Sequence, residues 1–102
     1  MSIRVDRWTK SFAPDPTELQ KQMEAEGYTV TEHSDAPGTV HSPHDHCDDQ
    51  SLWIISGSAQ LRVGDENYTL TAGDRDYLPA HTEHSALAIG EEMVVYLSGV
   101  KN

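Results

Sequence analysis

Three histidines and one glutamine stand at spacings that suit a metal site. His44 and His46 are separated by one residue, and Gln50 follows four positions after His46. His84 stands later in the chain, after a turn. If residues 44 to 54 form one strand, then His44, His46 and Gln50 point to the same face, because side chains two positions apart share a face. His84 must then come from another strand, since ligands along one strand cannot surround an ion.

The charge of the chain excludes two classes of partner. Seventeen acidic residues against seven basic ones give a formal net charge of -10. This charge repels the phosphate backbone of nucleic acids and the anionic surface of membranes. No apolar stretch is long enough to cross a bilayer. We therefore expect neither nucleic acid nor a membrane as a partner.

Length and cysteine content indicate one small cytoplasmic domain. The 102 residues, of which 36% are hydrophobic, suit a single domain with a modest core. Cys47 is the single cysteine, so an intrachain disulfide is excluded, and residues 1–6 lack the apolar run of a signal peptide. A reducing cytoplasm is the expected compartment.

One helix is expected, over residues 16–26. Its ends carry the usual signals, which are an N-cap at Asp15, proline at Pro16, a capping-box Glu18 and a glycine, Gly27, just past the end. Leu19 and Met23 form a narrow apolar stripe that can pack this helix against a sheet. The helix is interpreted as structural.

From Tyr28 onward, short alternating runs separated by turn residues predict strands. The expected strands cover residues 28–33, 52–55, 59–63, 68–70, 77–78, 84–89 and 93–98, with a hairpin loop at 64–67. Many short strands at this spacing favour a closed barrel or a sandwich. The apolar residues expected to fill its core or an interface are Leu52, Ile54, Leu61, Val63, Leu70, Leu78, Leu87, Ile89, Val95 and Leu97.

The residues around the first two histidines resemble the first conserved motif of the cupin superfamily. This motif begins at Gly38, contains His44 and His46, and ends at Gly57 with matching spacing. Gln50 stands where that family usually has a glutamate.

A second segment resembles the second cupin motif. It begins at Gly73, turns at Pro79 and reaches His84. His81 stands in place of the usual glycine, and Ala88 in place of a common asparagine. Two spaced motifs are far more specific than a pair of histidines alone.

The resemblance implies an all-β fold, a small antiparallel β-barrel of the jelly-roll type found in small single-domain RmlC-like cupins, with one short N-terminal helix. Residues 1–102 would form a single cupin domain, with the barrel over about residues 28–98 and an N-terminal strand and helix within residues 1–27. In the family, the positions of His44, His46 and His84 hold a divalent metal, and the position of Gln50 usually donates a carboxylate. The implied cofactor is Fe, Mn, Zn, Ni or Cu.

Gln50 changes what such a site can do. A divalent ion held by neutral ligands keeps its double charge, which favours an anionic small-molecule substrate and weakens the affinity for hard cations. An amide cannot accept a proton as a general base. Three roles stay open for Gln50. It ligates the ion weakly, it orients a bound water by a hydrogen bond, or it leaves a three-histidine site with open positions.

The resemblance leaves several functions open, and no catalytic residue can be named. A dioxygenase-type enzyme is the leading hypothesis, and a metal-dependent isomerase or lyase is the second. A non-catalytic protein that binds or senses a small ligand is the alternative class. A purely structural barrel is disfavoured, because inward polar ligands are costly to bury without a partner. Members of the family commonly pair, so we expect a homodimer, with residues Ile3 to Trp8 as a strand that can join the partner's sheet.

The remaining polar and aromatic residues are interpreted as structural. His81 is expected in a turn with positive φ, which histidine tolerates better than most residues other than glycine, rather than at the mouth of the site as a proton carrier. Trp53 and Tyr96 are expected to pack in strands. The residues expected to do no chemistry are His33 and His41, at the surface with no partner that the sequence can name, and Cys47, on the strand face opposite His46.

Overall fold

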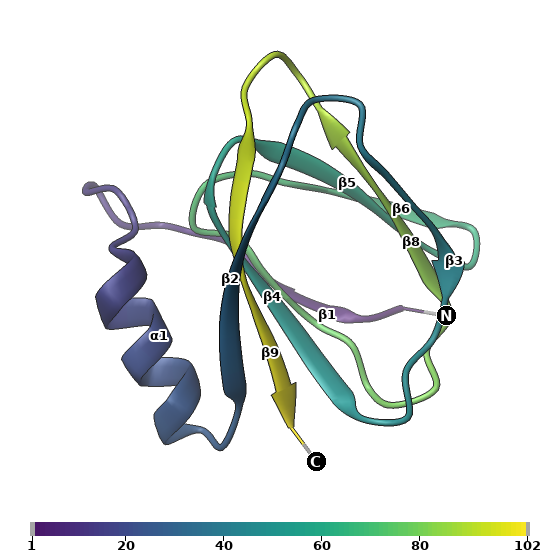
Figure 1. Cartoon of the computed structure of the whole chain (residues 1–102), viewed down its shortest axis with the longest axis horizontal. Helices are drawn as coiled ribbons and strands as arrows, with labels where there is room; N and C mark the ends of the chain where they lie inside the picture. The colour runs from purple at the N-terminus through teal and green to yellow at the C-terminus, as the bar shows by residue number, and fades with distance from the viewer. Residues whose placement is uncertain (1, 102) are drawn as a thin grey trace.

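Two antiparallel β-sheets face each other, and one helix covers the outer side of one of them (Figure 1). The computed structural model describes residues 2–101. The elements are β1 (Arg4–Asp6), α1 (Pro16–Ala25), β2 (Thr29–Asp35), β3 (Val40–His44), β4 (Asp49–Ser56), β5 (Ser58–Val63), β6 (Glu66–Leu70), β7 (Arg75–Tyr77), β8 (His84–Ile89) and β9 (Val94–Lys101). The first sheet has the order β1-β7-β4-β9-β2, and the second has the order β3-β8-β5-β6.

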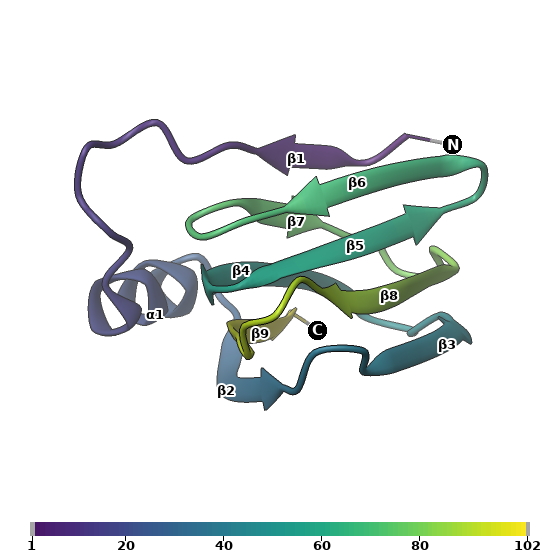
Figure 2. The ribbon, with the colours of Figure 1, turned by 90° about the horizontal axis from the view of Figure 1, so that it is seen from above.

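The predicted all-β jelly roll with one short N-terminal helix is confirmed, and its described strands form two sheets rather than one closed ring. Seen from above, β1 and β2 lie at opposite sides of the first sheet (Figure 2). The N-terminal strand, expected as an addition to a partner's sheet, pairs with β7 of its own chain, where Arg4 lies opposite Tyr77. No helix of the described part of the chain has the length and apolarity to span a membrane.

Helix α1 starts where the sequence predicts and ends one residue earlier. The Asp15 side chain accepts a hydrogen bond from the Thr17 N–H at 3.0 Å, and Pro16 takes the first helical position. The expected return bond from Glu18 is not among the hydrogen bonds of residues 2–101. Glu18 instead lies 3.9 Å from Lys21. The N-cap alone therefore sets the start of the helix.

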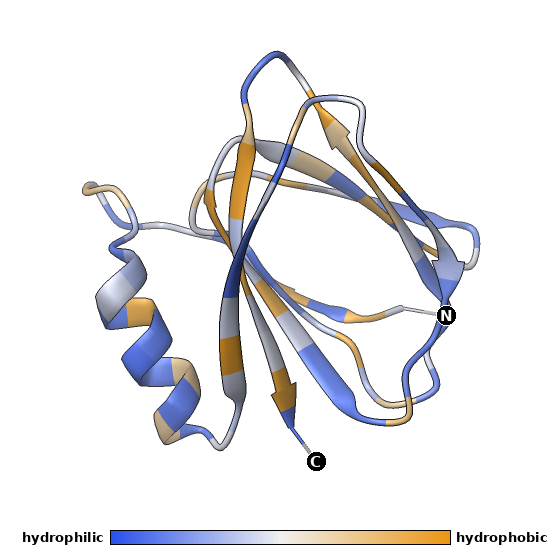
Figure 3. Ribbon diagram, in the orientation of Figure 1, coloured by the Kyte–Doolittle hydropathy of each residue, from blue (hydrophilic) through white to orange (hydrophobic). Residues whose placement is uncertain are grey.

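The apolar stripe of α1 packs on the outer face of the first sheet. Leu19 and Met23 are buried against Trp53 and Leu97. The hydrophobic residues of α1 are few, and most of the helix surface is hydrophilic (Figure 3). Trp53 is only 6% exposed, and its indole N–H donates to the Gly73 carbonyl. Its predicted packing role is confirmed.

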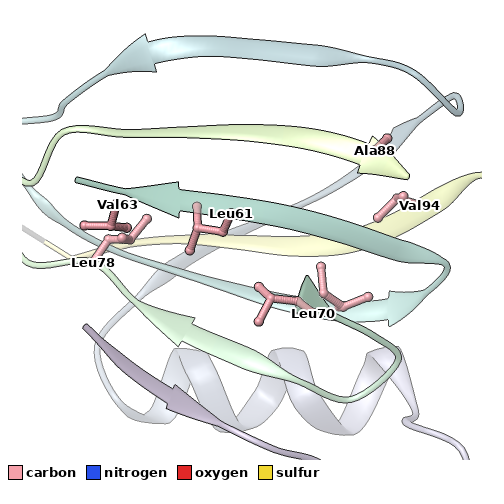
Figure 4. Close-up of a cluster of buried hydrophobic side chains, with 7 residues drawn as sticks. Leu61, Val63, Leu70, Leu78, Ala88 and Val94 are labelled. Atoms are coloured by element: carbon pink, nitrogen blue, oxygen red, sulfur yellow. The ribbon is translucent and has the colours of Figure 1, made fainter. Parts of the chain in front are cut away.

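A second apolar cluster fills part of the space between the sheets (Figure 4). Its buried members are Ile54, Leu61, Val63, Leu70, Leu78, Ala88 and Val94. Four residues expected in the core are half-buried, namely Leu52, Leu87, Ile89 and Val95. In β9 the inward face is taken by Val94 and not Val95, because a shift of one residue moves a side chain to the other face of a sheet.

Residues 44 to 54 do not form one strand, so that prediction was wrong. β3 ends at His44 in the second sheet, and β4 begins at Asp49 in the first. The pairing of β3 already shifts register between His41 and His44. Pro43 lies within that irregular stretch and cannot donate to the ladder. Residues 45–48 therefore carry the chain across from one sheet to the other.

Arg75 is buried on the outer side of the first sheet, between aromatic rings. It is 2% exposed, and its guanidinium lies 4.6 Å from the centre of the Trp53 ring and 4.5 Å from that of Tyr77. It donates to Glu26 at 2.7 Å and to the Ser51 hydroxyl at 2.8 Å. A buried cation is costly without a partner, so Glu26 both neutralises Arg75 and ties the end of α1 to the sheet. Arg75 also lowers the pKa of the Glu26 carboxyl.

Replacing Glu26 with alanine should leave Arg75 buried without its carboxylate. Because Glu26 itself is partly exposed, we expect the free energy of unfolding to fall by about 1 to 3 kcal/mol at neutral pH. This contribution is lost as the pH falls through the lowered pKa of Glu26. Urea unfolding of E26A and of the exposed control E24A checks it, and equal stability of the two variants would contradict the role of Glu26.

Asp76 is a buried carboxyl at the join between β4 and β7. Its Oδ1 accepts the Leu52 N–H at 2.8 Å, and its backbone carbonyl accepts the Ser51 hydroxyl at 2.6 Å. Its Oδ2 has no hydrogen-bond partner within residues 2–101. Burial raises the pKa of Asp76 to about 7, although the Leu52 N–H and the charge of Arg75 act in the opposite direction.

The raised pKa makes stability depend on pH. The folded state holds the Asp76 proton between about pH 4 and about pH 7, where the unfolded chain has lost it, so stability falls as the pH rises through this window. Asp76→Asn keeps an acceptor for Leu52 without the charge. We expect D76N to raise the free energy of unfolding at about pH 8 by up to about 4 kcal/mol, and to change it little at about pH 4. Urea unfolding across this range measures it, and parallel pH profiles for the two proteins would contradict the expectation.

Candidate metal centre

Three histidines from two strands and one connection converge at one end of the space between the sheets. His44 ends β3, His46 lies in the connection to β4, and His84 begins β8. His44 and His84 are directly opposite in the pairing of β3 with β8. The ring centres lie 4.8 Å apart for His44 and His46, 4.5 Å for His44 and His84, and 5.5 Å for His46 and His84. One ring nitrogen of each lies within 4.8 Å of the others, which is close enough to share an ion.

Backbone carbonyls orient two of the three rings. His44 Nδ1 lies 2.5 Å from the Ser42 carbonyl oxygen, and His84 Nδ1 lies 2.9 Å from that of Thr82. A carbonyl only accepts, so both Nδ1 atoms carry the proton and each Nε2 keeps its lone pair. This arrangement is typical of histidines that ligate a metal through Nε2.

Burial keeps the innermost histidine neutral. His84 is 7% exposed, and burial lowers the pKa of its imidazole. The neighbouring His44 and His46 lower it further, while the Thr82 carbonyl and the charge of Asp45 act the other way. A neutral imidazole does not have to lose a proton before it binds an ion. The three side chains therefore fit a divalent metal that accepts nitrogen ligands.

Gln50 lines the same cavity as the three histidines. The cavity holds about 250 Å³, and Gln50, Leu52 and Ile54 line it from alternate positions of β4. Backbone bonds of 2.8 Å and 2.7 Å tie Gln50 to Leu78 and fix its place on the strand. Direct ligation by Gln50 stays a prediction.

Two further residues, His81 and Cys47, lie near the three histidines in the chain. His81 has a φ of 64°, and it is the one residue other than glycine with positive φ in the described part of the chain. Its N–H donates to the His46 carbonyl at 2.7 Å, so the predicted turn role is confirmed and the turn also holds the connection. Cys47 is exposed in that connection, and the strand face expected for it does not exist.

Sequence reasoning missed polar residues that line the cavity from β2, β3 and β9. His41 was expected at the surface with no partner that the sequence could name, and the structure pairs it with Asp35 at 2.8 Å. His33 is exposed, yet it lines the cavity and its ring lies 5.6 Å from that of Tyr96. The missed signal was alternation, since His33 and Asp35 stand two apart and share a face of β2.

Comparison with known families identifies one match. The cupin domain model matches residues 31–100, which is more than half of the chain. The match includes both motifs and all three converging histidines. No curated protein matches the sequence significantly.

Solved structures with the same fold include several cupins. KdgF from Halomonas sp. is 26% identical with a TM-score of 0.63, over 74% of this chain and 72% of that one. An RmlC-like cupin from Shewanella frigidimarina NCIMB 400 is 20% identical with a TM-score of 0.63, over 74% and 68%. The DMSP lyase DddQ from Ruegeria pomeroyi DSS-3 is 17% identical with a TM-score of 0.68, over 74% and 39%. The last two show the fold alone.

A carboxylate at position 50 should strengthen metal binding. In Gln50→Glu, a negative oxygen replaces a neutral one beside the histidines, so we expect the Kd for Mn²⁺ or Fe²⁺ to fall by at least about tenfold. Competition with a chromophoric chelator measures the Kd. The control is Gln60→Glu, which adds the same charge on β5 at a position that does not line this cavity. Equal affinities of the two variants would place residue 50 out of reach of the ion.

Proposed function

Because this chain belongs to the cupin domain family, we propose that it is a metal-dependent enzyme for a small molecule, with His44, His46 and His84 as metal ligands. The observation that carries the proposal is the convergence of these imidazoles on the wall of a cavity of about 250 Å³. In this proposal residues 1–102 form a single cupin domain, which binds Fe, Mn, Zn, Ni or Cu. Gln50 lies beside the ion as a neutral ligand or as the partner of a bound water.

The leading reaction in this proposal is that of a dioxygenase-type oxidoreductase. In such a reaction the substrate is oxidised and takes up both oxygen atoms, and a redox-active ion such as iron would make oxygen reactive toward it. The chain's own part is to hold the ion with neutral side chains and to surround the substrate with apolar walls, including Leu52, Leu78 and Val94. Because the ligands are neutral, the ion keeps its double charge and an anionic substrate is favoured.

One observation favours a second candidate, a metal-dependent isomerase or lyase. These reactions need a group that moves a proton, and His41 with its partner Asp35 lines the same cavity. A bound ion would then act as a Lewis acid without changing its oxidation state. The likeness to a DMSP lyase does not choose between the candidates, since it rests on the fold.

The proposal also places the protein in the cytoplasm as a homodimer. Cys47 is an exposed free thiol, which a reducing compartment preserves. Val40, on the edge strand β3, is 66% exposed, and Met93 is 53% exposed. In this proposal a second copy covers these exposed apolar side chains.

Oxygen uptake by the iron-loaded protein tests the proposed reaction. With Fe²⁺ and a panel of small anionic substrates, we expect substrate-dependent oxygen uptake that falls to background in His46→Ala, because a ligand is lost. His81→Asn is the matched control, since it removes an exposed imidazole outside the cavity and asparagine tolerates positive φ.

The other outcomes of this experiment separate the alternatives. Turnover without oxygen uptake, supported equally by Zn²⁺, would favour the isomerase or lyase. A substrate-induced rise in Tm without any turnover would contradict the proposed catalytic activity and favour a protein that only binds the small molecule.

A further inference from the structure

A second polar cluster faces the cavity from the side of β2 and β9. Asp35 at the end of β2, His41 on β3 and Tyr96 on β9 all line the cavity that the three histidines share. His41 Nε2 lies 2.8 Å from Asp35 Oδ2. The His41 side chain is 42% exposed and that of Asp35 is 17% exposed, so His41 is accessible to a ligand.

The bond to Asp35 decides which nitrogen of His41 is free. An ionised carboxylate only accepts, so Nε2 of His41 must carry the proton in this bond. Nδ1 has no hydrogen-bond partner among residues 2–101. In neutral His41, Nδ1 therefore has a free lone pair, and a carboxylate at Nε2 stabilises the imidazolium that forms when Nδ1 takes a proton.

Tyr96 on β9 lines the cavity together with Asp35. Burial raises the pKa of Tyr96 to about 12, and the charge of Asp35 and a hydrogen bond to it act in the same direction. Tyr96 therefore stays protonated and keeps a hydroxyl proton to offer to Asp35. The ring of His33 stacks on Tyr96 at an interplanar angle of 30°. Asp35 thus bonds His41 from the second sheet and lies on the cavity wall with Tyr96 from the first.

Strand pairing places His41 one step from the candidate metal ligands. In the pairing of β3 with β8, His41 lies opposite Ala86, and His44 lies opposite His84. Residues directly opposite in an antiparallel pair share a face. Part of the cavity wall consists of small side chains, those of Ala86, Ala88 and Ala59. Their methyl groups leave room between His41 and the three candidate metal ligands. A small molecule in the cavity can therefore reach both.

The groups that face His41 are those that line the cavity with it. No lysine or arginine lines the cavity in the described part of the chain. The titratable groups that line the cavity with His41 are Asp35, His33, Tyr96, His44, His46 and His84. Asp35 is the one carboxylate among them, and it bonds His41 directly.

We propose that His41 accepts the proton of a small hydroxyl-bearing substrate, with Asp35 as the positioning residue. The substrate O–H bond breaks, an N–H bond forms at Nδ1, and the electron pair stays on the substrate oxygen. Loss of the proton turns the substrate into an anion, and a divalent ion at the three-histidine site attracts an anion. This inference rests on the proposed function, because it assigns a role beside the same site.

Counting protons during ligand binding tests the inference without any turnover. The probe is catechol, a small diol, titrated calorimetrically into Zn²⁺-loaded protein at about pH 8 in buffers that differ in protonation enthalpy. We expect the wild-type protein to release roughly one proton fewer than His41→Gln, because Nδ1 captures it. Asp35→Asn should resemble His41→Gln, since the imidazolium loses its carboxylate.

His81→Asn is the matched control for this experiment. His81 lies 4.0 Å from Asp45, so it is also a histidine beside a carboxylate, but it does not line the cavity. This variant should release as many protons as the wild type. Equal proton release by wild type, H41Q and D35N, all with the same zinc content, would overturn the role of His41 and leave the metal site standing. Failure of the wild-type protein to bind zinc would overturn the proposed function, and this inference with it.

Discussion

The pairing of β3 with β8 is the constraint on which the candidate site depends. It sets His44 opposite His84 and, one step along the same face, His41 opposite Ala86. The connection of residues 45–48 then carries His46 back toward the pair as the chain crosses to the first sheet. A slip of this register by one residue would turn the side chains of β3 to the outer face. The site therefore exists only in one register, and the bond from the His81 N–H to the His46 carbonyl helps to hold the connection in place.

The two faces of the first sheet have different tasks. Its inner face carries Gln50, Leu52 and Ile54 toward the cavity. Its outer face is closed by α1 and by Arg75, whose charge is matched by Glu26 at the end of the helix. This division keeps the buried guanidinium of Arg75 away from the cavity, where it would repel a metal ion. The inner face thus presents Gln50 and apolar side chains to the cavity, while the three histidines come from the second sheet and the connection.

Local patterns predicted much of this structure. The N-cap at Asp15, the stripe of Leu19 and Met23, and the positive φ of His81 follow from the preferences of single residues and their neighbours, and all are confirmed. The motif spacings indicated histidines that the fold brings together. The break after His44 was missed, because alternation alone does not show where a chain changes sheets. The pair of His41 with Asp35 was missed because it joins strands across a turn, and its partners are fixed only by tertiary packing.

Metal content is the most direct test of the central claim that His44, His46 and His84 form a metal site. Protein purified without an affinity tag, alongside the double variant H44A/H84A, can be analysed by elemental mass spectrometry. The predicted result is close to one equivalent of a transition metal per chain in the first protein and none in the second. The absence of metal from both, even after reconstitution with Fe²⁺, Mn²⁺ and Zn²⁺, would contradict it.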